Sequence, residues 1–463
     1  MDFRKSSYVI TTCVDHANGQ YVLMQGYTGA IDIVNKEIIK YLSSDVLTAK
    51  SFPYSKKTFF RLVERGYITK KSKNEEIAYV KKVSGPLHQR NKLLSTKNFT
   101  FLVTYDCNFR CPYCFEREII KDGNNSLRLT FSKKLVDKAF EAISKIEPNK
   151  KLQNRSIQLF GGEPLLKENK EIVKYIVNKG RNYGFTFVAT SNGYDLDCYE
   201  DLLKDGYIQG VQVTVDGSKT VHDSRRIHSV NIHSFDKIIG NIKMALNRGI
   251  AIKIRINIDS NNIGEIVKLN NFFNEAGLYS YEKFSVYAAY ISGEVNFNPT
   301  AYEQNKLKNI TQQDFLNTLN SENVKIKHDE QLYLNIYNSI YKNKNLMLFP
   351  CHCDAQNNSY IFDPLGNLYS CLEIVGNKNE SIGTYKDDVI WTEGKNKWFS
   401  RNTGILDKCS KCKYVFLCGG GCFAKVLTSS NHIESYCDGY STRFKDIVCK
   451  IYSRLKDENM INV

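Results

Sequence analysis

The feature that most constrains this chain is a repeat of strand-like and helix-like stretches between residues 98 and 300. Short runs rich in β-branched and aromatic residues recur there, and each of the first five is followed by a longer, charged amphipathic stretch. Such alternation is typical of parallel β/α units, which build the α/β fold class. It predicts a full or partial barrel, with functional residues at the carboxyl ends of the strands. The six predicted strands are Phe99–Thr104, Ser156–Phe160, Phe185–Thr190, Gly210–Val215, Ile252–Ile258 and Lys283–Ala288.

The regions on either side of this repeat differ in character and predict three further segments. Residues 1–90 hold a strand at Tyr21–Met24 and helical patterns at Asp32–Leu42 and Lys57–Arg65, followed by a predicted β-hairpin of Tyr67–Thr69 and Ala78–Val83. We expect a small winged-helix-like domain there. The repeat is assigned to residues 96–300, a polar helical connector to 301–345, and a cysteine-rich domain to 346–455. The last segment has too little apolar pattern for a conventional core, so bound metal would supply the missing stability.

Composition limits the classes of protein to which the chain can belong. No apolar stretch of about 18 residues occurs, and the N-terminus lacks the apolar core of a secretory signal, so we expect a cytoplasmic protein without a membrane span. The net charge of +15 would suit an anionic partner, but the lysines are scattered, so nucleic acid is not favoured. Because no export signal is expected, the 14 cysteines indicate reduced thiols, and the 11 of them that cluster in 107–114 and 351–437 indicate metal or redox ligands. Cys13, Cys198 and Cys449 lie outside these clusters and are expected to be small buried hydrophobic residues.

Three cysteines follow the first predicted strand in the spacing C-x3-C-x2-C, at Cys107, Cys111 and Cys114. Three thiolates on one loop can hold three irons of a [4Fe–4S] cluster and leave the fourth iron open to a substrate or cofactor. A structural zinc site normally has four protein ligands, and no fourth ligand is obvious in this loop. A zinc loop completed by a distant residue is the alternative interpretation.

This loop resembles the cluster-binding loop of the radical S-adenosylmethionine (SAM) superfamily, whose fold is a partial (β/α)6 barrel. Tyr113 matches the aromatic position that lies against adenine in that family, and Arg226 matches the residue that would pair with the SAM carboxylate. The resemblance continues at successive strand ends, with Thr in place of the more usual Ser at position 214. The positions that resemble the family's SAM-binding motifs are Gly161, Gly162, Glu163, Ser191, Asn192, Thr214, Asp216, Arg226, Arg255 and Asn257.

A second group of cysteines lies between residues 351 and 437 in the order C, G-x4-C, C-x2-C-x5-C-x3-C, C. This order resembles the SPASM domain, an extension of peptide-modifying radical SAM enzymes that binds two auxiliary [4Fe–4S] clusters. The resemblance assigns one cluster to Cys409, Cys412, Cys418 and Cys437. It assigns the other to Cys353, Cys371 and Cys422, together with the uncertain fourth ligand Cys351. If Cys351 does not bind, one iron stays open. The spacing also suits a pair of zinc ribbons.

The resemblance implies an enzyme that cleaves SAM to a 5′-deoxyadenosyl radical, with an electron donor such as flavodoxin or ferredoxin. Residues 1–90 resemble the peptide-recognition element that captures a leader peptide by strand addition. This domain order is typical of maturases of ribosomally made peptides, and we favour thioether crosslinks from a cysteine sulfur to a carbon. The alternatives are carbon–carbon crosslinking, oxidation of Cys or Ser as in anaerobic sulfatase-maturating enzymes, and a zinc-containing nucleic-acid-binding protein without enzymatic activity. The sequence assigns no catalytic base.

Overall fold

The computed structural model describes residues 2–116, 130–231, 233–259, 261–290, 330–427, 434–437 and 439–461. The chain divides into two compact units, and each is assembled from separate pieces of the sequence. The first unit comprises Met1–Leu93, Asp329–Cys353 and Ser400–Val463, and the second comprises Leu94–His328 and Asp354–Phe399. The four segment boundaries expected from the sequence stay a prediction. Among the described helices, none is both long and apolar enough to cross a membrane.

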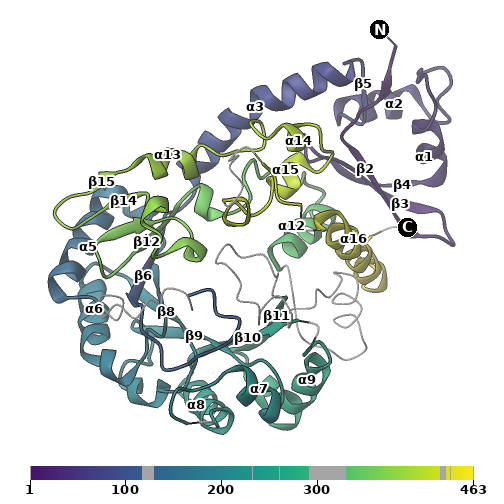
Figure 1. The fold of residues 1–463 in the computed structure, drawn as a ribbon. Helices are drawn as coiled ribbons and strands as arrows, with labels where there is room; N and C mark the ends of the chain where they lie inside the picture. Colours follow the sequence, from purple (N-terminus) through teal and green to yellow (C-terminus); the bar gives the residue numbers. More distant parts are fainter. Residues whose placement is uncertain are drawn as a thin grey trace. The chain divides into compact units, whose positions relative to one another are not determined.

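The second unit is built on a ten-stranded sheet, of which the six strands predicted from the sequence form a parallel part (Figure 1). Their spatial order follows the chain, β6 next to β7 and so on to β11, and every neighbouring pair is parallel. This arrangement confirms the expected α/β fold. The strands are β6 (Asn98–Thr104), β7 (Ser156–Gly161), β8 (Thr186–Ser191), β9 (Ile208–Thr214), β10 (Ala251–Ile258) and β11 (Phe284–Tyr290).

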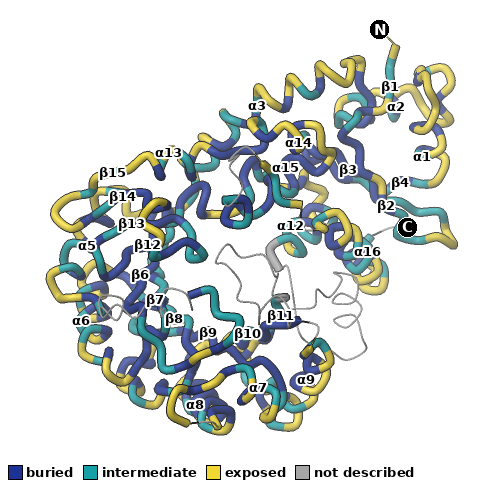
Figure 2. Tube along the Cα trace, in the orientation of Figure 1, coloured by how far each residue is buried: buried dark blue, intermediate teal, exposed yellow. Residues whose placement is uncertain are grey.

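Amphipathic helices cover the outer face of this sheet, because the strands need apolar cover on both faces. In α5, for example, Val136, Phe140 and Ile143 are buried at helical spacing, and the side chain of Ser132 caps the N-terminus. Figure 2 shows the buried strands inside and the exposed helix surfaces outside. The helices of this unit are α5 (Lys133–Ile146), α6 (Lys170–Asn182), α7 (Lys219–Arg225), α8 (Phe235–Asn247), α9 (Glu265–Glu275) and α13 (Glu393–Phe399).

Four short strands from the cysteine-rich part of the chain extend the same sheet beyond β6. The first of them, β12, pairs in parallel with β6, with Ser359 opposite Asn98, and the other three continue as an antiparallel meander. The buried carboxylate of Asp363 fixes the turn after β12, since it accepts hydrogen bonds from the Tyr105 hydroxyl (3.0 Å) and the Leu365 amide (3.0 Å). These strands are β12 (Ser359–Phe362), β13 (Asn367–Tyr369), β14 (Gly383–Thr384) and β15 (Ile390–Trp391).

The first unit is built around a three-stranded antiparallel sheet of β2 (Val9–Asp15), β3 (Gln20–Gln25) and β4 (Ile31–Asn35), in that order. One face packs on α1 (Lys36–Leu42) and α2 (Lys56–Glu64) through residues such as Leu23, Phe59 and Leu62. The other face packs on α12 (Glu330–Tyr341) and α16 (Tyr440–Asp457) through residues such as Met24 and Phe444. Residues from both ends of the chain therefore share one core. The remaining elements are β1 (Arg4–Lys5), β5 (Ile68–Thr69), α3 (Lys73–Leu94), α14 (Asp407–Ser410) and α15 (Val415–Cys418).

Two local predictions for the N-terminal region are wrong. The expected hairpin strand Ala78–Val83 lies inside helix α3, where Glu76, Val80, Ser84 and His88 are buried at a spacing of four residues. The Glu76 carboxylate fixes the start of that helix by accepting hydrogen bonds from the Ser6 hydroxyl (2.5 Å) and Arg4 Nη2 (2.7 Å). The expected helix Asp32–Leu42 is a strand until Asn35, whose side chain caps α1, so only its second half is helical.

Candidate active site

The cysteine loop follows β6 directly, as the sequence predicts. Cys111 is buried, and Cys107 and Cys114 are half-buried. The Phe109 amide donates to Cys107 Sγ (3.3 Å), and the Cys114 amide donates to the Cys111 carbonyl (3.2 Å), so the loop folds back on itself. Burial raises the pKa of all three thiols, and the neighbouring cysteines act in the same direction on Cys107 and Cys114. Bound metal would offset this effect, because it holds cysteine as the thiolate.

The described residues contain no group of three or more His, Cys, Asp or Glu side chains with the geometry of a single metal ion site. An iron–sulfur cluster makes a different demand, because its cysteine thiolates bind different irons rather than converging on one ion. Each of the three thiols on this loop can therefore bind one iron of a cluster.

Two glycines after β7 bring that strand end against the cysteine loop. The amides of Gly162 and Glu163 donate to the carbonyls of Thr104 (3.0 Å) and Asp106 (2.8 Å). A Cβ atom on Gly162 would lie 2.3 Å from the Asp106 carbonyl oxygen, and one on Gly161, whose φ is +137°, would lie 2.2 Å from that of Thr104. The glycines therefore permit a close approach between two protein segments.

The carboxylate of Glu163 joins the ends of β7 and β8. It is buried and accepts hydrogen bonds from the Ser191 hydroxyl (2.9 Å) and the amides of Asn192 (2.5 Å) and Leu165 (2.8 Å). Burial raises the pKa of Glu163 to about 7, although these three donors oppose the shift. The Asn192 side chain continues to the cysteine loop, where its Nδ2 donates to Asn108 Oδ1 (2.7 Å).

A second buried carboxylate, that of Asp216 after β9, is the centre of a hydrogen-bond network. It accepts from the Tyr113 hydroxyl and from the Asn257 amide (3.0 Å) on β10, while the Asp216 carbonyl accepts from Asn262 Nδ2 (2.8 Å). Arg255 supports this network, since its Nε donates to Asn257 Oδ1 (2.8 Å). Residues from the ends of β6, β9 and β10 thus meet around Tyr113, which directly precedes the last cysteine of the loop.

Arg226 is a buried cation beside this network. Its Nη1 donates to the Tyr113 hydroxyl (3.1 Å), and its guanidinium lies 5.4 Å from the centre of the Phe109 ring. Cys111, Tyr113 and Asp216 hold the pKa of Arg226 above its ordinary value against the effect of burial. Its Nε is buried without a hydrogen-bond partner among the described residues, which suits a residue that binds a carboxylate.

The structure thus brings the sequence-predicted residues of the second unit together at one end of its parallel strands. The sequence reasoning missed several of their partners. Asn108, in the cysteine loop, bonds to Asn192, Asn262 bonds to Asp216, and Arg225, the last residue of α7, pairs with Asp259 (2.8 Å). Such single polar residues give no periodic signal in the sequence. The sequence reasoning also assigned no role to Glu116, which is buried; burial, Glu373 and Glu163 raise its pKa to about 8.

Seven of the eight later cysteines belong to the first unit, and their chain segments approach one another. Burial, Cys412 and Cys437 raise the pKa of Cys409, so three predicted ligands of one cluster are neighbours. The Cys412 amide also donates to the Cys409 carbonyl (3.0 Å). Cys371, which follows β13, belongs to the second unit.

The triple glycine between Cys418 and Cys422 lets two other segments approach the backbone of this loop. All three glycines have positive φ angles. A Cβ atom on Gly419 would lie 2.3 Å from the Cys351 carbonyl oxygen, and one on Gly421 would lie 1.8 Å from that of Tyr436. Only glycine fits such contacts, so the triplet brings the Cys351 and Cys437 segments beside the loop.

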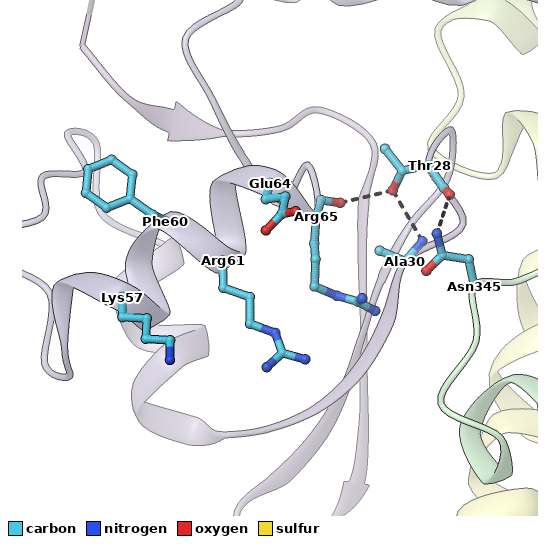
Figure 3. Close-up of a pocket in the computed structure, with 8 residues that line it drawn as sticks. All are labelled: Thr28, Ala30, Lys57, Phe60, Arg61, Glu64, Arg65 and Asn345. Atoms are coloured by element: carbon cyan, nitrogen blue, oxygen red, sulfur yellow. Dashed lines mark hydrogen bonds between the residues drawn. The ribbon is translucent and has the colours of Figure 1, made fainter.

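A pocket of about 700 Å³ lies in the first unit between α2 and the start of β4 (Figure 3). Cations dominate its charged lining: neither Lys57 nor Arg61 forms an ion pair with a described residue, and Arg65 pairs with Asp32. Phe60 adds an apolar ring with 54% of its surface exposed. Strand β4 pairs only with β3 among the described strands, and Ala30, which directly precedes it, lines the pocket. At the start of the strand, Arg65 Nη2 donates to the Ile31 carbonyl (2.9 Å). The lining residues are Thr28, Ala30, Lys57, Phe60, Arg61, Glu64, Arg65 and Asn345.

Residues 101–272 match the radical SAM superfamily. The chain is 31% identical to the GTP 3′,8-cyclase of Campylobacter fetus over 38% of its own length, and that match spans only 51% of the cyclase. A longer match is to the cysteine-type anaerobic sulfatase-maturating enzyme of Clostridium novyi, which is 24% identical over 75% of this chain and 93% of the enzyme. The resemblance predicted from the motifs is thereby confirmed.

Two solved structures resemble the fold. The structure of anSMEcpe with bound AdoMet has a TM-score of 0.56 at 18% identity and covers 79% of this chain and 96% of that one. Streptococcus suis SuiB bound to S-adenosylmethionine has a TM-score of 0.50 at 13% identity and covers 94% of this chain and 99% of that one. Both are likenesses of fold, and they agree with the expected partial barrel.

Proposed function

Because residues 101–272 match the radical SAM superfamily, we propose that this chain is an enzyme that modifies a ribosomally synthesised peptide, and that it forms thioether crosslinks from cysteine sulfur to carbon. The observation that carries the peptide substrate is that β4 pairs only with β3 among the described strands, and that Ala30, directly before β4, lines the cationic pocket. An extended leader segment can add to such an edge through main-chain hydrogen bonds, while the pocket receives its side chains. The likeness of fold to SuiB extends over 94% of this chain.

The residues around the cysteine loop fit a SAM-binding cluster. Cys107, Cys111 and Cys114 would hold three irons, and the open iron with SAM supplies a 5′-deoxyadenosyl radical that removes hydrogen from an unactivated carbon. The buried Nε of Arg226 would pair with the SAM carboxylate. Tyr113, held by Asp216, would lie against the adenine. The strand ends that carry the other predicted contacts adjoin this loop, so they orient SAM and keep water away.

The later cysteines fit two auxiliary clusters, with ligands divided as the SPASM resemblance implies. The hydrogen bond from the Cys412 amide to the Cys409 carbonyl (3.0 Å) and the effect of Cys412 and Cys437 on the pKa of Cys409 support the first set. The packing of the Cys351 segment on Gly419 supports a role for Cys351 in the second. An electron donor such as flavodoxin or ferredoxin would reduce the enzyme.

The decisive experiment is anaerobic reconstitution followed by incubation with SAM, dithionite and a cysteine-containing precursor peptide encoded beside the gene. We expect a brown protein with about three [4Fe–4S] clusters, formation of 5′-deoxyadenosine, and a peptide product that lacks two hydrogen atoms per thioether. Replacing the three loop cysteines by Ala should abolish SAM cleavage, whereas Cys198→Ala in the same unit should not. A colourless zinc protein without SAM cleavage would leave the nucleic-acid-binding alternative.

Oxidation of a cysteine or serine is the second candidate activity, favoured by the long match to a sulfatase-maturating enzyme. A peptide with a sulfatase-type cysteine distinguishes the two, because its oxidation yields an aldehyde that hydrazide reagents label. Carbon–carbon crosslinking is distinguished from thioether formation by alkylation of the product. A carbon–carbon product keeps its thiols and takes up iodoacetamide, whereas a thioether does not.

Leader binding has a test of its own. Lys57→Glu combined with Arg61→Glu should weaken binding of a fluorescein-labelled leader peptide at least about tenfold, a loss of roughly 1.4 kcal/mol. Lys40→Glu on α1 reverses a charge on the same unit outside the pocket and should leave affinity unchanged. Equal affinities of all three proteins would exclude the pocket as the leader site.

A further inference from the structure

Arg401 is a buried arginine in the first unit, two residues after the end of α13. Only 1% of its surface is exposed. Its Nη2 donates to the Glu434 carbonyl (2.5 Å), whereas Nε and Nη1 are buried without a hydrogen-bond partner among the described residues. Unpartnered donors on a buried guanidinium are rare and call for an explanation. Here they indicate an acceptor that the polypeptide itself does not supply.

The negative charges that act on Arg401 are those of cysteines. Burial lowers the pKa of its guanidinium, and four nearby cysteines act in the opposite direction when they are ionised. In the described part of the chain, no carboxylate lies within ion-pair distance of Arg401. Its other close neighbour is the Phe423 ring, whose centre lies 4.7 Å from the guanidinium carbon. The four cysteines are Cys409, Cys422, Cys353 and Cys351.

These four cysteines come from both predicted auxiliary ligand sets. Cys409 belongs to one set, and Cys351, Cys353 and Cys422 belong to the other. An arginine keeps its charge even when buried, and a buried charge requires a counter-charge. Protonated thiols are neutral and cannot provide it, whereas thiolates bound to a cluster can. The arginine and the cysteines therefore compensate one another only in the metal-loaded protein.

We propose that Arg401 is a positioning residue for the auxiliary clusters, whose two unpartnered N–H groups face cluster sulfur and whose charge raises the clusters' reduction potential. This inference rests on the proposed auxiliary clusters. Reduction adds one negative charge to a cluster that is already anionic, and a nearby cation in a low-dielectric interior favours that product. The reduction potential of an iron–sulfur cluster depends on hydrogen bonds to its sulfur atoms and on its net charge. Because its cysteine neighbours span both sets, Arg401 acts on both clusters.

The test is a potentiometric titration of the reconstituted full-length enzyme with dithionite, followed by EPR spectroscopy. Arg401→Gln removes the charge, Arg401→Lys keeps it, and Arg454→Gln removes an exposed positive charge on α16, where Arg454 pairs with Glu458. We expect Arg401→Gln to shift the ratio of reduced to oxidised auxiliary cluster at least tenfold toward the oxidised form, which is about 59 mV for one electron. Arg401→Lys should shift it less, and Arg454→Gln should not shift it. The SAM-dependent signal of the first cluster serves as an internal control.

Each outcome decides the question. A wild-type protein that binds iron for one cluster only would refute the auxiliary clusters, and with them the premise, before any variant is made. Full iron content with an unshifted midpoint in Arg401→Gln would overturn the role of Arg401 and leave the clusters standing. If Arg401→Gln loses auxiliary iron while Arg401→Lys retains it, the need for a positive charge is supported. Loss of auxiliary iron in both variants would overturn the proposal, because a preserved charge should preserve the clusters.

Discussion

The hydroxyl of Tyr113 donates a hydrogen bond to the buried carboxylate of Asp216, and this bond ties the cysteine loop after β6 to the end of β9. Arg226 donates to the same hydroxyl (3.1 Å), so the tyrosine links an anion and a cation. Tyr113, which directly precedes Cys114, is thus fixed by β9, a strand three positions away from β6 in the sheet. The loop geometry depends on this contact as well as on the cysteines.

Tyr113→Phe tests that dependence. The substitution keeps the ring and removes the donor, leaving a buried carboxylate oxygen with one partner fewer, so we expect a loss of about 1–3 kcal/mol in the free energy of unfolding. Urea titration of the reconstituted protein measures it. Tyr281→Phe, which removes an exposed hydroxyl bonded to Asn247 (2.7 Å), should cost less than about 0.5 kcal/mol. Equal losses for the two variants would contradict the special role of Tyr113.

Gly162→Ala should disrupt the packing of β7 against the cysteine loop. The new methyl group would lie 2.3 Å from a backbone oxygen of Asp106, which cannot move aside without moving the loop. We expect destabilisation of about 1–3 kcal/mol and reduced iron content of the first cluster. Gly240→Ala in α8 meets no atom within 4 Å and should stabilise the protein by up to about 1 kcal/mol. Thermal unfolding and iron analysis of both variants make the comparison. A loss of stability and iron in Gly162→Ala alone shows that the steric contact is the cause, and not the change to alanine in general.

Cys409→Ala and Cys412→Ala should separate radical generation from peptide modification. Both residues are remote in sequence from the loop that would hold SAM, so some formation of 5′-deoxyadenosine should survive while the modified peptide is lost. Chromatography of both products from one reaction gives the comparison. Cys449→Ala, a half-buried cysteine outside the predicted ligand sets, should retain both activities. Crosslinked peptide from the Cys409 or Cys412 variant would show that their cluster is dispensable.

His222 makes the stability of the protein depend on pH. Burial, followed by the charge of Arg226, lowers its pKa to about 3 from an unfolded value of 6.5. The folded protein therefore holds His222 neutral. Its contribution to the free energy of unfolding is complete above pH 6.5 and is lost as the pH falls from 6.5 toward 3. The loss amounts to about 1.4 kcal/mol per pH unit below that point. His222→Gln should remove this slope in urea titrations between about pH 7.5 and about pH 5.5, and an unchanged slope would exclude His222 as its source.

The barrel strands and the order of the motifs could be predicted from the sequence because both are local patterns. Each apolar run from Phe99 to Ala288 is a strand in the structure, and consecutive parallel strands place their ends side by side. That rule alone predicts that Cys107, Glu163 and Asp216 gather at one edge. Their geometry agrees with it.

Other features depend on contacts between distant segments, which periodicity does not reveal. The stretch from Ala78 to Val83 looks like a strand, but it lies in a helix that begins beside the buried carboxylate of Glu76 and buries one side chain every four residues. Arg401 sits among other polar residues in the sequence, and only folding places it beside four cysteines. The sequence also does not predict the role of the asparagines that hold the cysteine loop, because asparagines in such roles occur at no regular spacing.

The sheet of β2, β3 and β4 precedes the barrel in the chain, yet one of its faces packs on α16, which follows the barrel. A ribosome that has made the whole barrel has therefore not yet supplied the cover for Ile10, Val22 and Met24. Until α16 is synthesised, those side chains lack the part of their apolar cover that α16 supplies, and the core beside the later cysteines is incomplete. Maturation of this enzyme is thus ordered in time: the barrel can form during translation, whereas the unit that carries most of the later cysteines can close only after it.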